Sequence, residues 1–119
     1  MIAVRTDIDA LPIEEQVKHE FTSKYQGAMH ACGHDIHMAS ILATGIQLKE
    51  IEDELNGRVR LIFQPAEELG HGAFEIINTG VLKGAKAVLG FHNYPTLKVG
   101  EFAIKSGAIT SAVDRFEFN

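Results

Sequence analysis

The clearest pattern along the chain is a run of apolar residues from Asp35 to Leu55, in which spacings of three and four dominate. Because a helix turns once about every 3.6 residues, these spacings place the apolar side chains together and predict a helix of about five turns. Asp35 lies in its first turn, where free backbone N–H groups favour an anion. Asn56 and Gly57 then supply a stop signal.

Shorter segments predict the other elements. Three apolar runs rich in β-branched residues predict strands, of which we expect the first and the last to be buried: Ile2–Val4, Arg58–Gln64 and Ala87–Phe91. A short helix is predicted over Gly72–Thr79. Alternating apolar and polar residues predict two further strands, over Lys98–Lys105 and Thr110–Phe118. The polar stretch from Ile13 to Gly27 has no clear period and is predicted to be a loop.

The order strand–helix–strand–helix–strand is typical of an α/β fold, with a largely parallel sheet and right-handed crossover helices. A length of 119 residues fits one domain or a piece of one. In such sheets, binding sites form beyond the carboxyl ends of the strands. Polar residues follow all three strand ends, and we expect them to gather at one edge of the sheet. They are Asp7 and Asp9, then Glu67 and Glu68, then His92.

Composition excludes some classes of function. The chain has 16 acidic and 11 basic residues, a net charge of −5, which argues against a nucleic-acid or anionic-membrane partner. Its single cysteine, Cys32, cannot form an internal disulfide, so we expect a reducing compartment in which the thiol is free to bind metal. Neither a signal peptide nor an apolar run of about 20 residues is found, and we expect a cytoplasmic protein.

The segment from His30 to His37 (HACGHDIH) is the strongest chemical signal, because thiolate and imidazole are preferred ligands of borderline transition metals. In an extended segment Cys32 and His34 point the same way and could face one metal ion. The alternative is a small buried cysteine beside a histidine at a helix start. His37 lies one helical turn from His34 and is expected to orient a ligand.

Two further positions suggest the same chemistry. Glu67 and Glu68 directly follow a strand, and their side chains diverge, so one could bind metal while the other acts as a general base. The alternative is a solvated acidic turn. His92 also follows an apolar strand, where it could be a ligand or a histidine with ordinary hydrogen bonds. Of the other histidines, we expect a packing or orienting role for His30 and solvated positions for His19 and His71.

Four motifs occur together and in order: Asp7–Pro12 (DIDALP), Met29–His37 (MHACGHDIH), Ile62–Glu68 (IFQPAEE) and Gly90–Pro95 (GFHNYP). This combination resembles the amidohydrolase branch of the aminoacylase/carboxypeptidase metallopeptidases. Hippurate hydrolases, indole-acetyl–amino-acid hydrolases and N-acetyl-diaminopimelate deacetylases belong to that branch. The resemblance covers essentially the whole chain, and it implies the partial catalytic domain of a zinc-peptidase-like metallohydrolase.

The resemblance implies two divalent metal ions, Mn²⁺ or Zn²⁺. It matches their ligands to Cys32, His34, Glu68 and His92, with Cys32 between the two ions. It matches the general base to Glu67, which would take a proton from water and deliver it to the leaving amine. The implied reaction is hydrolysis of the N-acyl amide bond of an N-acyl amino acid. We expect four further residues to contact the ligands without binding the metal themselves: Asp7, Asp9, Asp35 and His37. Asp7 stands at the position where related branches carry a metal-binding histidine.

Members of that family are several-fold longer than this chain. By resemblance, residues 1–108 form part of the catalytic domain, and residues 109–119 begin a lid and dimerisation domain. In such proteins the chain then returns from the lid domain to the catalytic domain, and this last part supplies one more histidine ligand. We therefore expect the full-length parent to be an active homo-oligomer and this chain alone to be weakly active or inactive.

Two other classes of function remain open from the residues. Four donors, Cys32, His34, Glu68 and His92, could close a structural zinc site without catalysis. A thiol hydrolase with Cys32 as nucleophile is a third class, but it would leave the two glutamates without a task. Neither glycine-rich nucleotide-binding pattern follows a predicted strand.

Overall fold

The computed structural model describes residues 1–110. The elements follow one another as β1 (Ile2–Asp7), α1 (His34–Glu50), β2 (Val59–Gln64), α2 (Gly72–Asn78) and β3 (Ala87–Leu89), with one 3-10 turn, Glu52–Glu54, after α1. The predicted α/β fold with a parallel sheet and crossover helices is confirmed. Within residues 1–110, no helix combines the length and the apolar character needed to cross a bilayer.

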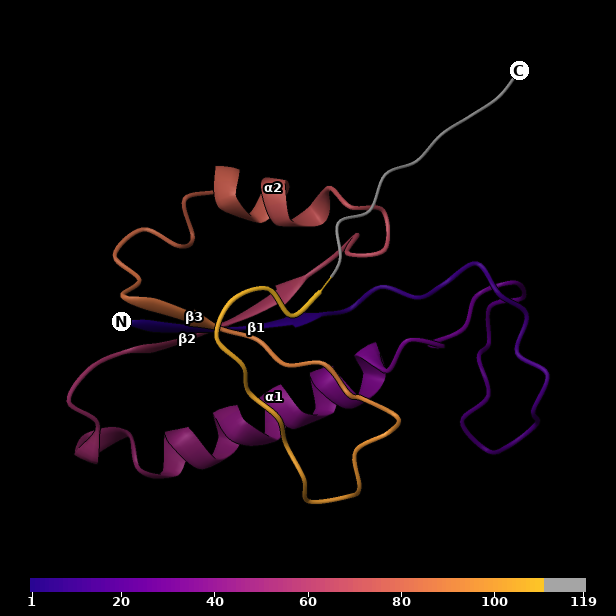
Figure 1. Ribbon diagram of the computed structural model, residues 1–119, viewed down its shortest axis with the longest axis horizontal. Helices are drawn as coiled ribbons and strands as arrows, with labels where there is room; N and C mark the ends of the chain where they lie inside the picture. The colour runs from indigo at the N-terminus through magenta and orange to yellow at the C-terminus, as the bar shows by residue number, and fades with distance from the viewer. Residues whose placement is uncertain (111–119) are drawn as a thin grey trace.

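The three strands form one parallel sheet in the order β2-β1-β3. The register pairs Ile2 with Val59 on one side and with Ala87 on the other. At the opposite end of β1, Asp7 pairs with Gln64. In Figure 1, α1 lies on one side of the sheet and α2 on the other. Right-handed crossovers require this, because the steps from β1 to β2 and from β2 to β3 run in opposite directions across the sheet. The carboxyl ends of the strands therefore meet at a single edge, where the polar residues follow them.

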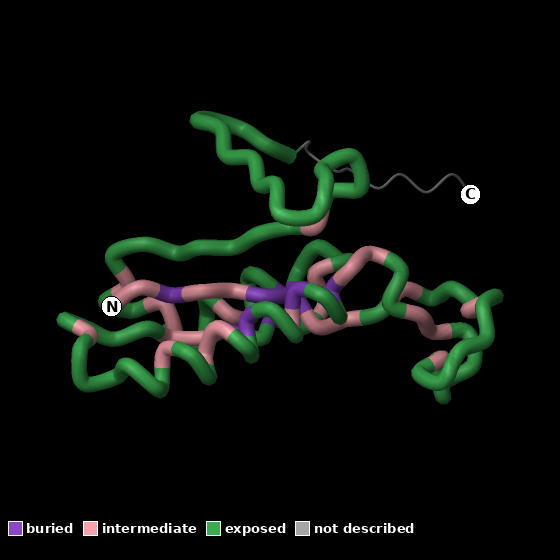
Figure 2. Tube along the Cα trace, turned by 90° about the horizontal axis from the view of Figure 1, so that it is seen from below, coloured by how far each residue is buried: buried purple, intermediate pink, exposed green. Residues whose placement is uncertain are grey.

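The buried interior is small and partly polar. The buried apolar side chains are Ala3, Ile41 and Ile62, whereas Thr6, Asp7, His34, His37 and Gln64 are the buried polar ones. Figure 2 shows the buried positions gathered in the middle of the molecule with exposed chain around them. Burying polar groups costs free energy unless they are paired. Apolar packing therefore does not explain why these polar side chains are buried.

Helix α1 ends at Glu50, five residues before the predicted end. The chain then forms the 3-10 turn Glu52–Glu54, which consists of three acidic residues. The C-terminal end of a helix carries a partial negative charge, so these carboxylates disfavour its continuation. The period of the apolar residues cannot report this effect, because Ile51 and Leu55 still fit the helical spacing.

Two strand predictions need correction. β3 is shorter than predicted and is not buried, since Val88 and Leu89 are about half exposed on this edge strand. The strand predicted over Lys98–Lys105 is wrong, because these residues pair with no strand of the described region and Val99 and Phe102 are exposed. Alternation alone does not supply the neighbouring backbone that a strand needs. The strand predicted over Thr110–Phe118 lies almost entirely outside the described residues.

The segment between β1 and α1 is a loop, as predicted. Leu11 and Met29 close its base through two backbone hydrogen bonds of 2.9 and 3.1 Å, which form an isolated antiparallel bridge. Figure 1 shows the intervening residues as an excursion away from the sheet. This closure returns the chain to the carboxyl end of β1 just before Cys32.

Candidate metal centre

The donor side chains come from four separate segments that meet at the carboxyl edge of the sheet. Asp7 ends β1, Glu67 and Glu68 follow β2, and His92 follows β3. The start of α1 adds Cys32 and His34. Cys32, His34 and His92 each offer an atom within 4.8 Å of the other two, as do His34, Glu67 and Glu68. The predicted convergence of these side chains is thus present in the structure.

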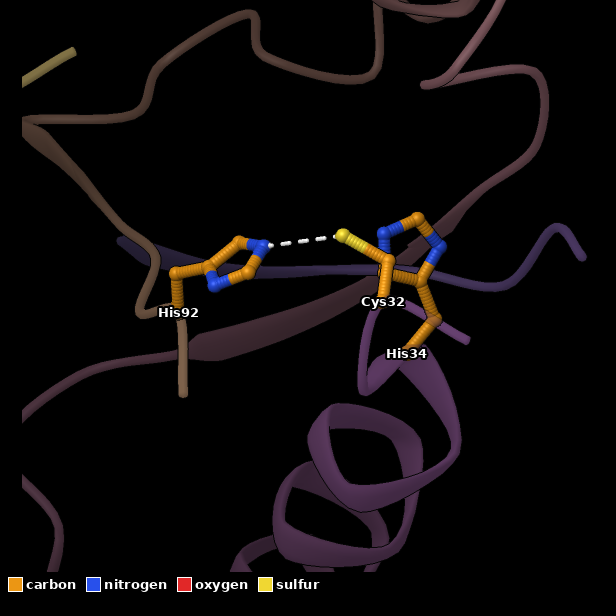
Figure 3. A group of neighbouring side chains, drawn as sticks. All are labelled: Cys32, His34 and His92. Atoms are coloured by element: carbon orange, nitrogen blue, oxygen red, sulfur yellow. Dashed lines mark hydrogen bonds between the residues drawn. The ribbon is translucent and has the colours of Figure 1, made fainter. Parts of the chain in front are cut away.

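Cys32 and His92 face each other across this edge (Figure 3). The Cys32 Sγ lies 3.5 Å from the His92 Nε2. The other ring nitrogen, Nδ1, donates a hydrogen bond of 2.7 Å to the carbonyl oxygen of Asn93. Because a neutral imidazole carries one proton, this bond leaves Nε2 with a lone pair toward the sulfur. Both atoms therefore lie where they could bind one metal ion.

The buried His34 is the centre of the arrangement. Its Nδ1 donates a hydrogen bond of 2.9 Å to the Asp9 carbonyl oxygen, so in the neutral ring its Nε2 carries the lone pair. That Nε2 is buried and has no hydrogen-bond partner among the described residues. The acidic oxygens around it lie at 3.6 Å (Glu68), 3.8 Å (Asp7) and 3.9 Å (Glu67).

A buried lone pair surrounded by carboxylate oxygens is unfavourable, because all of these atoms are electron-rich and repel one another. A cation at this point would bind His34 and the carboxylates together and remove the conflict. The donor set of one thiol, two imidazoles and carboxylates matches the ligands that zinc and related divalent ions take. The residues present therefore fit a metal centre, on the evidence of the unpaired His34 Nε2.

A tight turn after β2 positions the two glutamates. Ala66 has a φ of 53°, which is uncommon for a residue with a side chain and marks local strain. The Gly72 N–H donates to the Ala66 carbonyl oxygen at 3.1 Å and closes the turn. A Cβ at Gly72 would overlap the carbonyl oxygen of Pro65. The turn thus depends on a glycine that no donor motif includes.

Glu68 is tied to the site more closely than Glu67. Its backbone N–H donates a hydrogen bond of 3.0 Å to Asp9 Oδ2, and its carboxylate is the acidic group nearest the His34 Nε2. Burial, a hydrogen bond with Glu68 and the negative charges of nearby carboxylates raise the pKa of the Cys32 thiol to about 11. Without a cation, the thiol is therefore protonated at neutral pH.

Asp7 has both carboxylate oxygens occupied. Oδ1 accepts a hydrogen bond of 2.7 Å from the His37 Nδ1, and Oδ2 accepts one of 2.8 Å from the Arg5 guanidinium. Burial acts to raise the pKa of Asp7, but the bond from His37 and the charge of Arg5 outweigh it and lower the pKa. These contacts agree with a supporting position for Asp7 rather than that of a free ligand.

The other predicted residues have different surroundings. Asp9 contacts both His34 and Glu68, and His37 is fully buried between Asp7 and Asn93. Asp35 was expected behind the ligands, but it is exposed in the first turn of α1 and makes no hydrogen bond to a predicted ligand within residues 1–110. The helix start explains its position, because the free backbone N–H groups of the first turn stabilise an acidic side chain.

The other three histidines lie outside the site, whereas three residues that the sequence did not predict lie beside it. His30, His19 and His71 are exposed, and the last two form pairs with Glu15 and Glu75. Sequence analysis missed Arg5, Gln64 and Asn93, which surround the carboxyl end of β1. Arg5 donates through Nε to the Gln64 Oε1 at 2.9 Å. The position of Asn93 directly after His92, and of Arg5 two residues before Asp7, was the only available signal.

Residues 3–118 match the sequence profile of the peptidase family M20/M25/M40. The chain belongs to this family. It is 53% identical over 117 residues to an N-acetylcysteine deacetylase of Bacillus subtilis, covering 98% of this chain and 31% of that protein. It is 44% identical to an N-acyl-L-amino acid amidohydrolase of Geobacillus stearothermophilus, covering 98% of this chain and 32% of that protein.

A solved structure supports the same assignment. A dinuclear metal-binding peptidase of the M20 family from Bacillus subtilis superimposes with a TM-score of 0.80 at 56% identity, over 83% of this chain and 28% of that one. The family resemblance drawn from the four motifs is thereby confirmed, together with the α/β fold. The chain spans about a third of the length of the curated relatives it matches.

Proposed function

We propose that this chain carries the greater part of a centre for two divalent metal ions, in a protein that hydrolyses the N-acyl amide bond of N-acyl amino acids. The observation that supports it most is the buried, unpartnered Nε2 of His34 among carboxylate oxygens. The matched relatives named as deacetylase and amidohydrolase support the reaction class. Their names describe those proteins, and the substrate of this one belongs to the proposal.

The proposed ligands are Cys32, His34, Glu68 and His92. Bound divalent ions would supply Lewis-acid polarisation of the scissile carbonyl and a lowered pKa for the attacking water. Glu67 is left as the general base, because it lies beside the same His34 nitrogen at 3.9 Å and makes no hydrogen bond through its carboxylate within residues 1–110. From there it would accept the water proton and return it to the leaving amine.

The donor set bears on which metal is bound. Thiolate and imidazole ligands favour zinc, whereas carboxylates also suit manganese. The Cys32 Sγ close to the His92 Nε2 supports a sulfur ligand in the centre, and we propose zinc as the tighter-binding ion. A dinuclear relative supports two ions rather than one.

A structural zinc site without catalysis is the second candidate. The grouping of Cys32, His34 and His92 favours it, because these donors with one glutamate would complete four-coordinate zinc. It gives Glu67 no task, however. The thiol hydrolase has less support, because a thiol whose pKa is raised to about 11 is a poor nucleophile at neutral pH.

The test uses this chain and the longest reading frame that contains it, each loaded with zinc or manganese. Release of free amine from a panel of N-acetyl amino acids is measured with and without a chelator. We expect hydrolysis by the longer polypeptide that the chelator abolishes, and weak or no hydrolysis by the 119-residue chain. Tight metal binding without hydrolysis by either polypeptide would favour the structural site and contradict the proposal.

A further inference from the structure

Asn93, which follows His92, uses both of its backbone polar groups at the metal centre. Its N–H donates a hydrogen bond of 2.9 Å to the His37 Nε2. Its carbonyl oxygen accepts the His92 Nδ1–H at 2.7 Å. One residue therefore connects a fully buried histidine of α1 with the histidine that faces Cys32.

The hydrogen bonds of His37 determine which of its nitrogens carries the proton. The His37 Nδ1 lies 2.7 Å from the Asp7 carboxylate, and Arg5 already neutralises that carboxylate at 2.8 Å. The Asp7 carboxylate accepts at Nδ1 while the Asn93 N–H points at Nε2, and these two hydrogen bonds place the ring proton on Nδ1. Its Nε2 is then an acceptor, as the Asn93 N–H requires.

The side chain of Asn93 links the second ligand-bearing segment. Its side-chain amide lies 2.9 Å from the His37 Nε2 and packs against Gly33. Because this Nε2 is an acceptor, the amide must turn its NH2 group rather than its oxygen toward the ring. Gly33 stands between Cys32 and His34 with a φ of 86°, and a Cβ there would overlap Asn93. The Asn93 side chain thus fills the space beside Gly33 and packs the segment after β3 against the start of α1.

We propose that Asn93 and His37 are positioning residues for the metal centre. Through Arg5 and Asp7 they fix His92 in the form protonated at Nδ1, with Nε2 directed at the Cys32 Sγ. An exposed neutral imidazole otherwise favours the proton on Nε2, which would block this nitrogen from binding metal. The inference rests on the proposed function only where it makes His92 a ligand, since the hydrogen bonds themselves involve no metal.

The first test needs no metal. Nitrogen-15 spectra of the imidazole rings in the metal-free chain at neutral pH report which nitrogen is protonated. We expect both His37 and His92 to carry the proton on Nδ1, whereas the exposed His71 serves as the internal reference. A proton on Nε2 of either residue, or on both nitrogens of His37, would overturn the proposal.

The second test measures zinc affinity by competition with a chelating dye. His37→Leu removes the acceptor of the Asn93 N–H and is expected to weaken zinc binding by about 10-fold to 100-fold, the range for groups that orient ligands. His37→Gln keeps an acceptor oxygen and is expected to restore most of the affinity. His71→Leu is the matched control and should leave affinity unchanged.

The outcomes separate the two proposals. If the unsubstituted chain binds no zinc, the proposed function fails, while the spectra still decide the positions of the protons. If His37→Leu binds zinc as tightly as the His71→Leu control, the positioning role is contradicted. Should His37→Leu fail to fold, as judged by circular dichroism, His37→Gln and the spectra carry the test. Loss of affinity in His37→Gln equal to that in a folded His37→Leu would also count against the proposal.

Discussion

The Cys32 Sγ lies 3.5 Å from the His92 Nε2, although 60 positions separate the two residues in the sequence. Parallel strands explain this contact, because β1 and β3 run side by side and both end at the edge where α1 begins. A site built this way needs no distortion of a helix or strand. Its ligands depend instead on the short segments that follow each strand.

Exchanging each glutamate for glutamine separates their proposed roles. Glu68→Gln is expected to lower bound zinc at least about 10-fold, because a neutral amide is a weaker ligand beside His34. Glu67→Gln should keep the metal and, in the longer polypeptide, reduce turnover by about 10²-fold or more. Metal analysis and amide hydrolysis on both variants provide the measurement. Loss of metal in Glu67→Gln alone would reverse the two assignments.

The raised pKa of the Cys32 thiol predicts slow alkylation of the metal-free chain. Thiolate is the reactive form, so the rate with iodoacetamide should rise with pH up to a midpoint of about 11. Glu68→Gln should lower this midpoint, because it removes a nearby negative charge. The urea-unfolded chain is the control, with a midpoint near the ordinary value of about 8.5. A folded chain whose midpoint matches the unfolded one would contradict this account.

The donor residues could be predicted from the sequence because they follow recognisable strands. Asp7, Glu68 and His92 stand at or just beyond strand ends, and a parallel sheet brings such ends to one edge. The run of donor residues around Cys32 suggests metal binding from the sequence alone, without knowledge of the fold. These inferences used only the order of elements and the chemistry of side chains.

The supporting residues could not be predicted in the same way. Asn93 acts mainly through its backbone N–H and carbonyl groups, which every residue but proline carries, so its identity gives no signal. The strain at Ala66 arises from the closed turn and not from a residue type known for positive φ. The predicted strand Lys98–Lys105 failed for a related reason, since pairing depends on a neighbour that local alternation does not reveal.

Gly72→Ala tests the turn that carries the glutamates. A Cβ at this position would overlap Pro65, so the backbone must shift, at a cost of about 1–3 kcal/mol in unfolding free energy. We also expect weaker zinc binding, because Glu68 moves with the turn. Gly57→Ala is the matched control, because nothing lies within 4 Å of its Cβ position. Urea unfolding and zinc titration of both variants decide it, and equal behaviour would rule out this role for Gly72.

The lowered pKa of Asp7 makes a specific contribution to stability that depends on pH. A carboxyl whose pKa is lower in the folded state stabilises the fold above its unfolded pKa of 3.8, and the contribution is lost as pH falls through the folded value. Asp7→Asn should therefore cost about 1–3 kcal/mol at about pH 6, since it removes the charge paired with Arg5. Urea unfolding as a function of pH measures this cost. The difference between the two proteins should shrink as the pH is lowered below 3.8, and a difference that grows there would refute the assigned sign.

The most direct measurement of the central claim is a Co²⁺ titration of this chain, followed by visible and near-ultraviolet absorption, in comparison with Cys32→Ser and His92→Ala. The account predicts tight binding with a thiolate-to-cobalt absorption band that Cys32→Ser abolishes, and weaker binding in His92→Ala. Binding without a thiolate band, or identical spectra for all three proteins, would contradict a metal centre shared by the thiol, the imidazoles and the carboxylates.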